Sequence, residues 1–279
     1  MTLMQLKGDR AHWSYSSLNG ILGVCSLQWA FERYWQVPPS GKVPGALTFG
    51  SAYHRAQEYW ATARQEGRQI QENDLRELFD TVFRRQVEED GDVDFDDGDI
   101  ESTARQGRDA IACAMAHTDP EERVLAVNST FCVPLTTADG TTLVKPLIGE
   151  ADCIVEKAGK RSVVDWKTSG ARYSDQKVRT SLQATAMLLG TTRTFGPVDA
   201  FAFDVVVKLK KAPVYERYTT TRSEDDFARL AALAAAADRI VAAEAFAPNE
   251  SGYGCAGCRY KAACRDWHVS KERVVPMAA

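Results

Sequence analysis

The first part of the chain repeats its apolar residues at helical intervals. Phe49, Tyr53, Ala56 and Trp60 recur every three or four positions, so they fall on one face of a helix. Apolar stripes of this kind are the usual sign of a helix packed on a core. Helices are therefore predicted over 14–35, 48–67, 72–88 and 100–117.

From about residue 124 the pattern becomes rich in β-forming residues, with turns at "ADG" and "KAGK". Strands are predicted over 123–135, 141–157 and 161–169, a helix over 175–190, strands over 198–210 and 214–221, and a long Ala-rich helix after Ser223. This order of elements predicts an α/β fold in which helices flank a mixed central β-sheet.

Composition places the chain among ordinary globular proteins. Its 279 residues are 44% hydrophobic and 26% charged, which allows a sizeable core. We find no apolar run of membrane-spanning length and no signal peptide at the start, so we expect a cytoplasmic protein without a membrane partner.

The net charge of −4 hides a strong asymmetry. Residues 88–101 carry nine acids and no bases, and residues 157–179 carry seven bases and two acids. The acidic run fails the calcium-loop pattern, because Asp97 stands where that loop needs glycine. We interpret it as a solvated loop, whereas the basic run could follow a phosphate backbone locally.

The segment "GEADCIVEKAGKRSVVDWKTS" carries the strongest catalytic signal. Asp165 and Lys167 share one face of a strand, and a hairpin can bring Asp152 beside them. Two close carboxylates favour a cation between them, of the Mg²⁺ or Mn²⁺ type. The alternative is an ordinary surface Asp–Lys pair, but the strand is apolar up to Asp165, and a buried acid needs a partner.

A second signal lies in "YGCAGCRYKAAC" (253–264), which holds Cys255, Cys258 and Cys264 within ten residues. Three thiols are one short of a tetrahedral metal site, and the total of seven cysteines argues against a fully paired disulfide set. A metal site, a redox pair and coincidence all remain open from the spacing. The other cysteines suit buried apolar positions: Cys113, Cys132 and Cys153.

"GEADCIVE" and "SVVDWKTS" resemble the metal-binding core of PD-(D/E)XK nucleases, in particular the RecB/AddB-like exonuclease branch. The resemblance covers most of the chain and implies a restriction-endonuclease-like sheet. It implies that His54, in "FGSAYHRAQE", completes the Mg²⁺ or Mn²⁺ site with Asp152 and Asp165. It also implies substrate-binding roles for Gln183 and for Arg179 one turn before it, both in "VRTSLQATAM", and a catalytic role for Lys167 with both carboxylates.

The same resemblance supplies a fourth thiol. In the iron–sulfur members of that branch one cysteine near the N-terminus joins three near the C-terminus, and "SYSSLNGILGVCSLQW" is similar to the first of these segments. The implied [4Fe–4S] ligands are Cys25, Cys255, Cys258 and Cys264, a set that also suits zinc. Position 25 and residues 248–268 would then join both ends of the chain.

The resemblance thus implies one nuclease domain over 1–279, with a helical insertion and acidic loop at 65–123. The expected activity is metal-dependent exonuclease hydrolysis of DNA, most simply single-stranded, in recombination, repair or phage DNA metabolism. No phosphate-loop motif occurs in the sequence, so a helicase partner would have to supply any motor. The alternatives are a CRISPR-adaptation-type end-trimming component that acts with an integrase, and a non-catalytic DNA-binding module.

Overall fold

The computed structural model describes residues 11–96 and 98–269. The chain divides into two compact units, and each is described by itself. The larger unit combines residues 43–133 with 149–223 and holds the sheet. The smaller unit combines the described parts of 1–42, 134–148 and 224–279.

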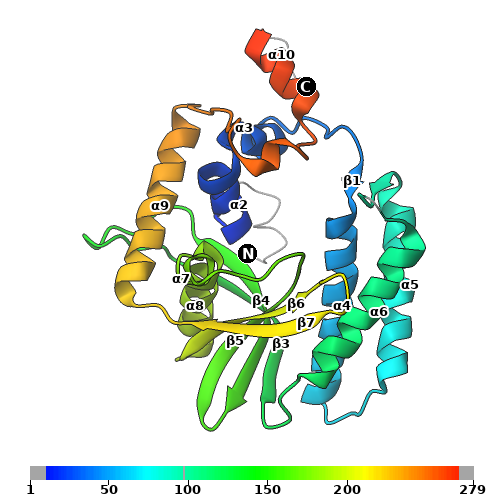
Figure 1. Ribbon diagram of the computed structural model, residues 1–279. Coiled ribbons are helices and arrows are strands. Elements are labelled where there is room, and N and C mark those ends of the chain that lie inside the picture. Colours follow the sequence, from blue (N-terminus) through cyan, green and yellow to red (C-terminus); the bar gives the residue numbers. More distant parts are fainter. Residues whose placement is uncertain (1–10, 97, 270–279) are drawn as a thin grey trace. The chain divides into compact units, whose positions relative to one another are not determined.

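A mixed five-stranded sheet organises the larger unit (Figure 1), in the spatial order β3-β4-β5-β6-β7. β4 and β5 pair antiparallel, β5 and β6 pair parallel, and β6 and β7 pair antiparallel. The predicted mixed sheet is therefore confirmed. The strands are β3 (Arg123–Val133), β4 (Leu147–Lys157), β5 (Lys160–Ser169), β6 (Ala200–Val207) and β7 (Val214–Thr220).

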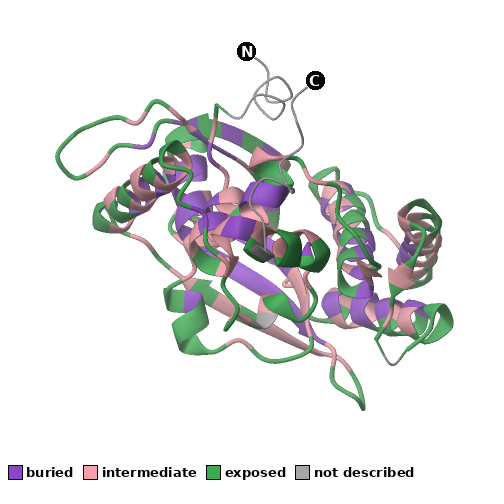
Figure 2. Cartoon of the chain, turned by 90° about the horizontal axis from the view of Figure 1, so that it is seen from above, coloured by how far each residue is buried: buried purple, intermediate pink, exposed green. Residues whose placement is uncertain are grey.

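Two helices, α4 (Gly45–Gln65) and α6 (Ile100–Ala116), pack against one face of this sheet, and α5 (Glu72–Asp90) packs on both of them. Their apolar stripes meet Cys153, Val164 and Trp166 of the sheet in one buried cluster. Figure 2 shows this burial in purple along the strands and on one side of the helices. The helical periodicity of the sequence predicted all three helices correctly, because each buries a single stripe.

The connection between the parallel strands β5 and β6 forms α7 (Asp175–Arg179) and α8 (Leu182–Phe195). Alternate residues of a strand point to opposite faces, so Asp165 points away from the α4–α6 cluster. α8 packs on that other face and brings Gln183 to Asp165. The continuous helix predicted over 175–190 is wrong at one point, since Ser181 is extended and caps α8.

Two other sequence predictions also need correction. The segment 14–35 is not one helix but four short pieces, which are α2 (Tyr15–Asn19), η1 (Gly20–Val24), α3 (Ser26–Trp29) and η2 (Ala30–Tyr34). The break lies at Cys25, whose backbone is extended. The acidic run is not simply a loop, because β2 (Val93–Asp94) pairs in parallel with β1 (Val43–Pro44).

The smaller unit also contains α9 (Glu224–Ala242), the short η3 (Tyr253–Cys255) and α10 (Lys261–Val269). Ser26 ties its N-terminal part to its C-terminal part, because the Ser26 hydroxyl both donates to the Ala247 carbonyl at 3.1 Å and accepts from the Ala247 N–H at 2.9 Å. Across the described residues, no helix combines the length and apolar character needed to span a membrane.

The close contact of α5 and α6 yields a stability prediction. A Cβ added to Gly107 would lie 1.9 Å from the ring of the fully buried Phe79. We expect Gly107→Ala to lower the free energy of unfolding by about 1–3 kcal/mol, because the core cannot absorb the clash. Gly50→Ala on α4 is the matched control, since nothing lies within 4 Å of its Cβ position. That change should be neutral or stabilise by roughly 0.5–1 kcal/mol. Equal effects in thermal or urea unfolding would contradict the prediction.

Candidate active site and cysteine pocket

The β4–β5 hairpin brings the two predicted carboxylates together. Its ladder pairs Cys153 with Val164, and the next positions along the two strands are Asp152 and Asp165. The Trp166 N–H donates to Asp152 Oδ2 at 3.1 Å, which fixes this carboxylate against β5. The hairpin geometry predicted from the sequence is therefore present.

Asp165 is the buried centre of the site. Its side chain is only 6% exposed, although it carries a carboxylate. Lys167 Nζ lies 3.0 Å from Oδ1 and 2.8 Å from Oδ2, and Gln183 Nε2 donates to Oδ1 at 2.6 Å. Oδ2 is fully buried and accepts no hydrogen bond from the described residues. Its one close positive charge is the Lys167 ammonium.

His54 reaches the carboxylates from α4. Its Nδ1 lies 3.4 Å from Asp152 Oδ2, and its ring meets the Trp166 ring at a steep angle, with 6.3 Å between the centroids. Tyr53, the preceding residue, is buried in the helix–sheet core, and its hydroxyl accepts a hydrogen bond from Gln57 Nε2 at 3.0 Å. With Tyr53 buried in this way, the His54 side chain reaches Asp152 of β4.

The protonation of the site follows from burial and charge. Burial raises the pKa of Asp152 to about 8, and the neighbouring Asp165 carboxylate raises it further. Burial lowers the pKa of Lys167, but Asp165 and Asp152 outweigh this and leave it above its usual value. Burial and the Lys167 charge lower the pKa of His54. At neutral pH this favours a charged Lys167 and a neutral His54, with a proton retained by Asp152.

The donor set of the site fits a hard divalent cation in its chemistry. It combines two carboxylates and a neutral imidazole, and one fully buried carboxylate oxygen lacks a hydrogen bond. In the described structure, however, no three His, Cys, Asp or Glu side chains converge closely enough to hold one ion. The reason at this site is visible, because Lys167 and Gln183 occupy the Asp165 oxygens that an ion would share.

Comparison with known proteins gives a family. The PD-(D/E)XK nuclease superfamily model matches residues 12–265, which is most of the chain. The chain belongs to the PD-(D/E)XK nuclease superfamily. Nucleases of this superfamily generally use divalent metals such as Mg²⁺ or Mn²⁺ and act on DNA. No curated protein matches the sequence at a significant level.

Comparison with solved structures also gives matches. The chain is similar to a candidate exonuclease from Eubacterium rectale, with a TM-score of 0.55 and 12% identity over 92% of each chain. It also matches the protein SSO0001, with a TM-score of 0.34 and 11% identity over 83% of this chain and 89% of that one. At this identity the first likeness concerns the fold alone.

Other predicted binding residues do not all lie at the superfamily site. Arg179 is exposed at the end of α7, and no contact joins it to the carboxylates. The basic run also divides, since Lys160 begins β5 about 17 Å of extended strand before Asp165.

The sequence pattern did not single out two residues near the site, Tyr218 and Lys177. Tyr218 of β7 stacks on Tyr173 at 5.5 Å between ring centroids, and Lys177 lies over the same Tyr173 ring. Only the membership of Lys177 in the basic run could have drawn attention to it. The role of Tyr218 depends on strand pairing, which the sequence pattern does not specify.

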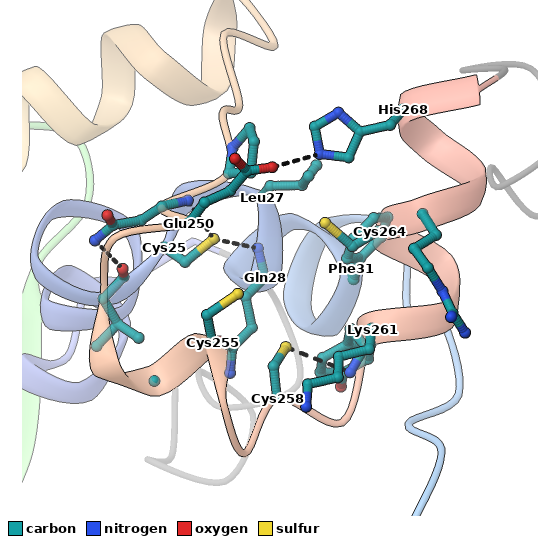
Figure 3. A pocket seen from close by; sticks show the side chains of 16 residues that line it. Cys25, Leu27, Gln28, Phe31, Glu250, Cys255, Cys258, Lys261, Cys264 and His268 are labelled. Atoms are coloured by element: carbon teal, nitrogen blue, oxygen red, sulfur yellow. Dashed lines mark hydrogen bonds and ion pairs between the residues drawn. The ribbon is translucent and has the colours of Figure 1, made fainter.

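The four predicted cluster cysteines line one cavity of about 350 Å³ in the smaller unit. Figure 3 shows the sulfur atoms of Cys25, Cys255, Cys258 and Cys264 turned toward a common space. Cys25 stands between η1 and α3, Cys255 ends η3, and Cys264 lies in α10. Residues more than two hundred positions apart are thus brought together by the fold.

Backbone N–H groups surround two of these sulfur atoms. Cys25 Sγ accepts from the N–H groups of Gln28 and Asn249, each at 3.4 Å, and Cys258 Sγ accepts from that of Tyr260 at 3.4 Å. Such donors stabilise thiolates, which are the metal-binding form of cysteine. By contrast, Cys132 is exposed on β3 and Cys113 is half-buried, so of the three cysteines predicted to be buried only Cys153 is confirmed.

The four thiols lie near one another but do not converge on a single point. Burial raises the pKa of Cys258, and the neighbouring Cys25 and Cys255 raise it further. A single tetrahedral zinc would need sulfur atoms about 3.8 Å apart. No three ligand side chains in the described part of the chain are grouped in that way. The four thiols line one cavity, and cysteine thiolates are ligands of both zinc and iron–sulfur clusters.

The raised pKa of Asp152 predicts how stability changes with pH. Because the folded-state pKa lies above the unfolded value, the folded protein loses stability as pH rises from about 4 to about 8. Without divalent ions, Asp152→Asn should therefore raise the melting temperature at pH 8, and have little effect near pH 4.

Glu156→Gln is the control on the same strand. A hydrogen bond from Arg123 lowers the pKa of Glu156, so this substitution should not stabilise the protein at pH 8. Thermal melting in a chelator would measure both effects. An Asp152→Asn variant that melts below the wild type at pH 8 would contradict the prediction.

Proposed function

We propose that this protein is a metal-dependent exonuclease that hydrolyses single-stranded DNA. The observation that carries the proposal is the buried Asp165 carboxylate, which pairs with the Lys167 ammonium at 2.8 Å and raises the pKa of the neighbouring Asp152. Burial of a carboxylate costs free energy, and binding of a catalytic cation and its substrate would account for this cost. Superfamily membership makes the substrate DNA, and the similar protein from Eubacterium rectale is described as a candidate exonuclease.

Mg²⁺ or Mn²⁺ would be held by His54, Asp152 and Asp165, with the Trp166 carbonyl as a further ligand. When bound, the ion would activate water and neutralise charge on the scissile phosphate. Its binding requires Asp152 to release a proton, because burial keeps this carboxyl protonated in the metal-free protein. It also requires the contacts of Lys167 and Gln183 with Asp165 to loosen.

Lys167 acts in this proposal as a charged donor. The two carboxylates hold its pKa above the usual value, so its ammonium keeps its proton at neutral pH. It can therefore orient the attacking water and stabilise negative charge that develops on the phosphate. Gln183 positions Asp165 through its 2.6 Å hydrogen bond, and a direct substrate contact is the alternative role for its amide.

The choice of a single-stranded substrate rests on the sequence. These 279 residues contain no phosphate-loop motif, so strand separation would have to come from a helicase partner. Recombination, repair or phage DNA metabolism would supply such strands. End trimming beside an integrase is a variant of the same chemistry, in which cleavage would depend on the added partner.

For the cysteine pocket we propose a [4Fe–4S] cluster ligated by Cys25, Cys255, Cys258 and Cys264. The support is the cavity that they share and the backbone N–H donors to Cys25 and Cys258. The proposed role is structural. The cluster would lock α3 to α10 inside the smaller unit, where hydrogen bonds such as Asn249 to Val24 already join the two segments.

The catalytic proposal predicts metal-dependent cleavage of single-stranded DNA labelled at either end. Asp165→Ala should reduce the rate at least about 100-fold, because the loss removes a central ligand. Glu156→Ala on the neighbouring strand is the control and should cleave normally. Gel analysis of both labels with Mg²⁺, Mn²⁺ or chelator gives the rates and the polarity. Cleavage that survives in Asp165→Ala would refute the assignment.

The cluster proposal predicts a brown protein after purification without air, with broad absorption near 400 nm. Cys25→Ser should lose the colour and the iron, and should melt at a lower temperature because the lock between α3 and α10 fails. Cys132→Ser, which changes an exposed thiol on β3, is the control and should keep both. Stoichiometric zinc in a colourless wild type would overturn the cluster assignment and leave the nuclease proposal intact.

A further inference from the structure

The face of the sheet that carries Asp165 continues across two more strands as an aromatic surface. Strand register pairs Asp165 with Phe203, and Phe203 with Tyr218. Residues paired in this way point to the same face of a sheet. Tyr218 therefore lies about 10 Å from Asp165 in the same row, since neighbouring strands are about 4.8 Å apart.

Tyr173, from the loop after β5, covers this row. Its ring stacks on Tyr218 with 5.5 Å between centroids and meets the edge of Phe203 at 5.6 Å. Its N–H donates to the Tyr218 hydroxyl at 3.1 Å, and that hydroxyl donates to Glu216. Arg172 also forms an ion pair with Glu216 at 2.5 Å. The loop is thus fixed to β7 by several independent contacts.

Lys177 stands on this platform. Its ammonium lies 3.4 Å from the centroid of the Tyr173 ring, and the Ser174 hydroxyl, which caps α7, holds its backbone N–H. No carboxylate in the described residues comes within ion-pair distance of Lys177. Burial, followed by the charge of Lys167, lowers the pKa of Lys177.

The Lys177 ammonium is affected by the charge of Lys167 and has no carboxylate to balance its own charge. Some other lysines have one, as Lys157 has in Asp119 and Lys145 has in Asp238. Lys177 is exposed, and the Tyr173 ring positions its ammonium at 3.4 Å from the ring centroid. The Lys177 ammonium is therefore already positioned to bind a phosphate group of a ligand.

We propose that Lys177, held on the Tyr173–Tyr218 platform, binds a backbone phosphate of the nucleic acid next to the phosphate that is cleaved. This inference rests on the proposed function, because it places the substrate strand along the row that starts at Asp165. Lys177 is a substrate-binding residue in this proposal and takes no part in proton transfer. Its contact selects a polyanionic strand over a single phosphodiester.

The test compares Lys177→Met with Lys160→Met. Each removes one ammonium from the same basic run, but Lys160 lies at the β4–β5 turn and has no place in the site. For an oligonucleotide substrate, Lys177→Met should raise KM about tenfold with kcat within about twofold of the wild type. The slope of log(kcat/KM) against log salt should become shallower by about 0.7, as for one lost phosphate contact on a single strand.

Lys177→Arg should retain most of the affinity, and Lys160→Met should match the wild type. Equal salt slopes for Lys177→Met and the wild type would overturn the inference, as would a loss confined to kcat. Equilibrium binding of a labelled oligonucleotide in chelator separates this result from a failure of the proposed function. A wild type that neither binds nor cleaves defeats the nuclease proposal, whereas normal wild-type binding that Lys177→Met leaves unchanged defeats only the Lys177 assignment.

Discussion

The burial of the Asp165 carboxylate is the constraint on which the larger unit depends. Val163 and Val164 carry β5 into the core, and Asp165 is the next residue, so its charge cannot reach bulk water. Lys167 follows on the same face of the strand, and α8 is placed so that Gln183 reaches the same carboxylate. The parallel β5–β6 crossover contains α8. It also contains the loop with Tyr173 and the short helix α7, which carries Lys177. The Asp165 side chain is therefore central both to the arrangement of the sheet and to the proposed chemistry.

In the smaller unit, a few contacts join two segments that lie far apart in the sequence. Its N- and C-terminal segments are joined by hydrogen bonds around Ser26 and Asn249, and four thiols face the cavity between α3 and α10. The extended backbone at Cys25 interrupts what the sequence pattern presents as one helix. That interruption lets the Cys25 sulfur accept backbone N–H groups from both segments, from Gln28 and from Asn249. A regular helix would have used the Gln28 N–H internally.

The periodicity of apolar residues predicted α4, α5 and α6 within a few positions, because each of these helices buries one stripe against a common core. It predicted the β4–β5 hairpin and the shared face of Asp165 and Lys167, since strand alternation is a local property. It failed at Cys25 and Ser181, where a single extended residue breaks a helical pattern. It also failed for Cys132, whose exposure follows from its position between the buried Phe131 and Val133.

The sequence by itself determined the elements, the superfamily resemblance and the candidates His54, Asp152, Asp165, Lys167 and Gln183, because these depend on residue type and local spacing. Only the tertiary structure decided which candidates meet. Gln183 touches Asp165, whereas Arg179 points to solvent from a separate helix. Lys177 became a candidate only when strand register put Tyr218 beneath Tyr173. Contacts between strands and across a crossover depend on register and helix placement, which are set by packing of the whole unit and not by neighbouring residues.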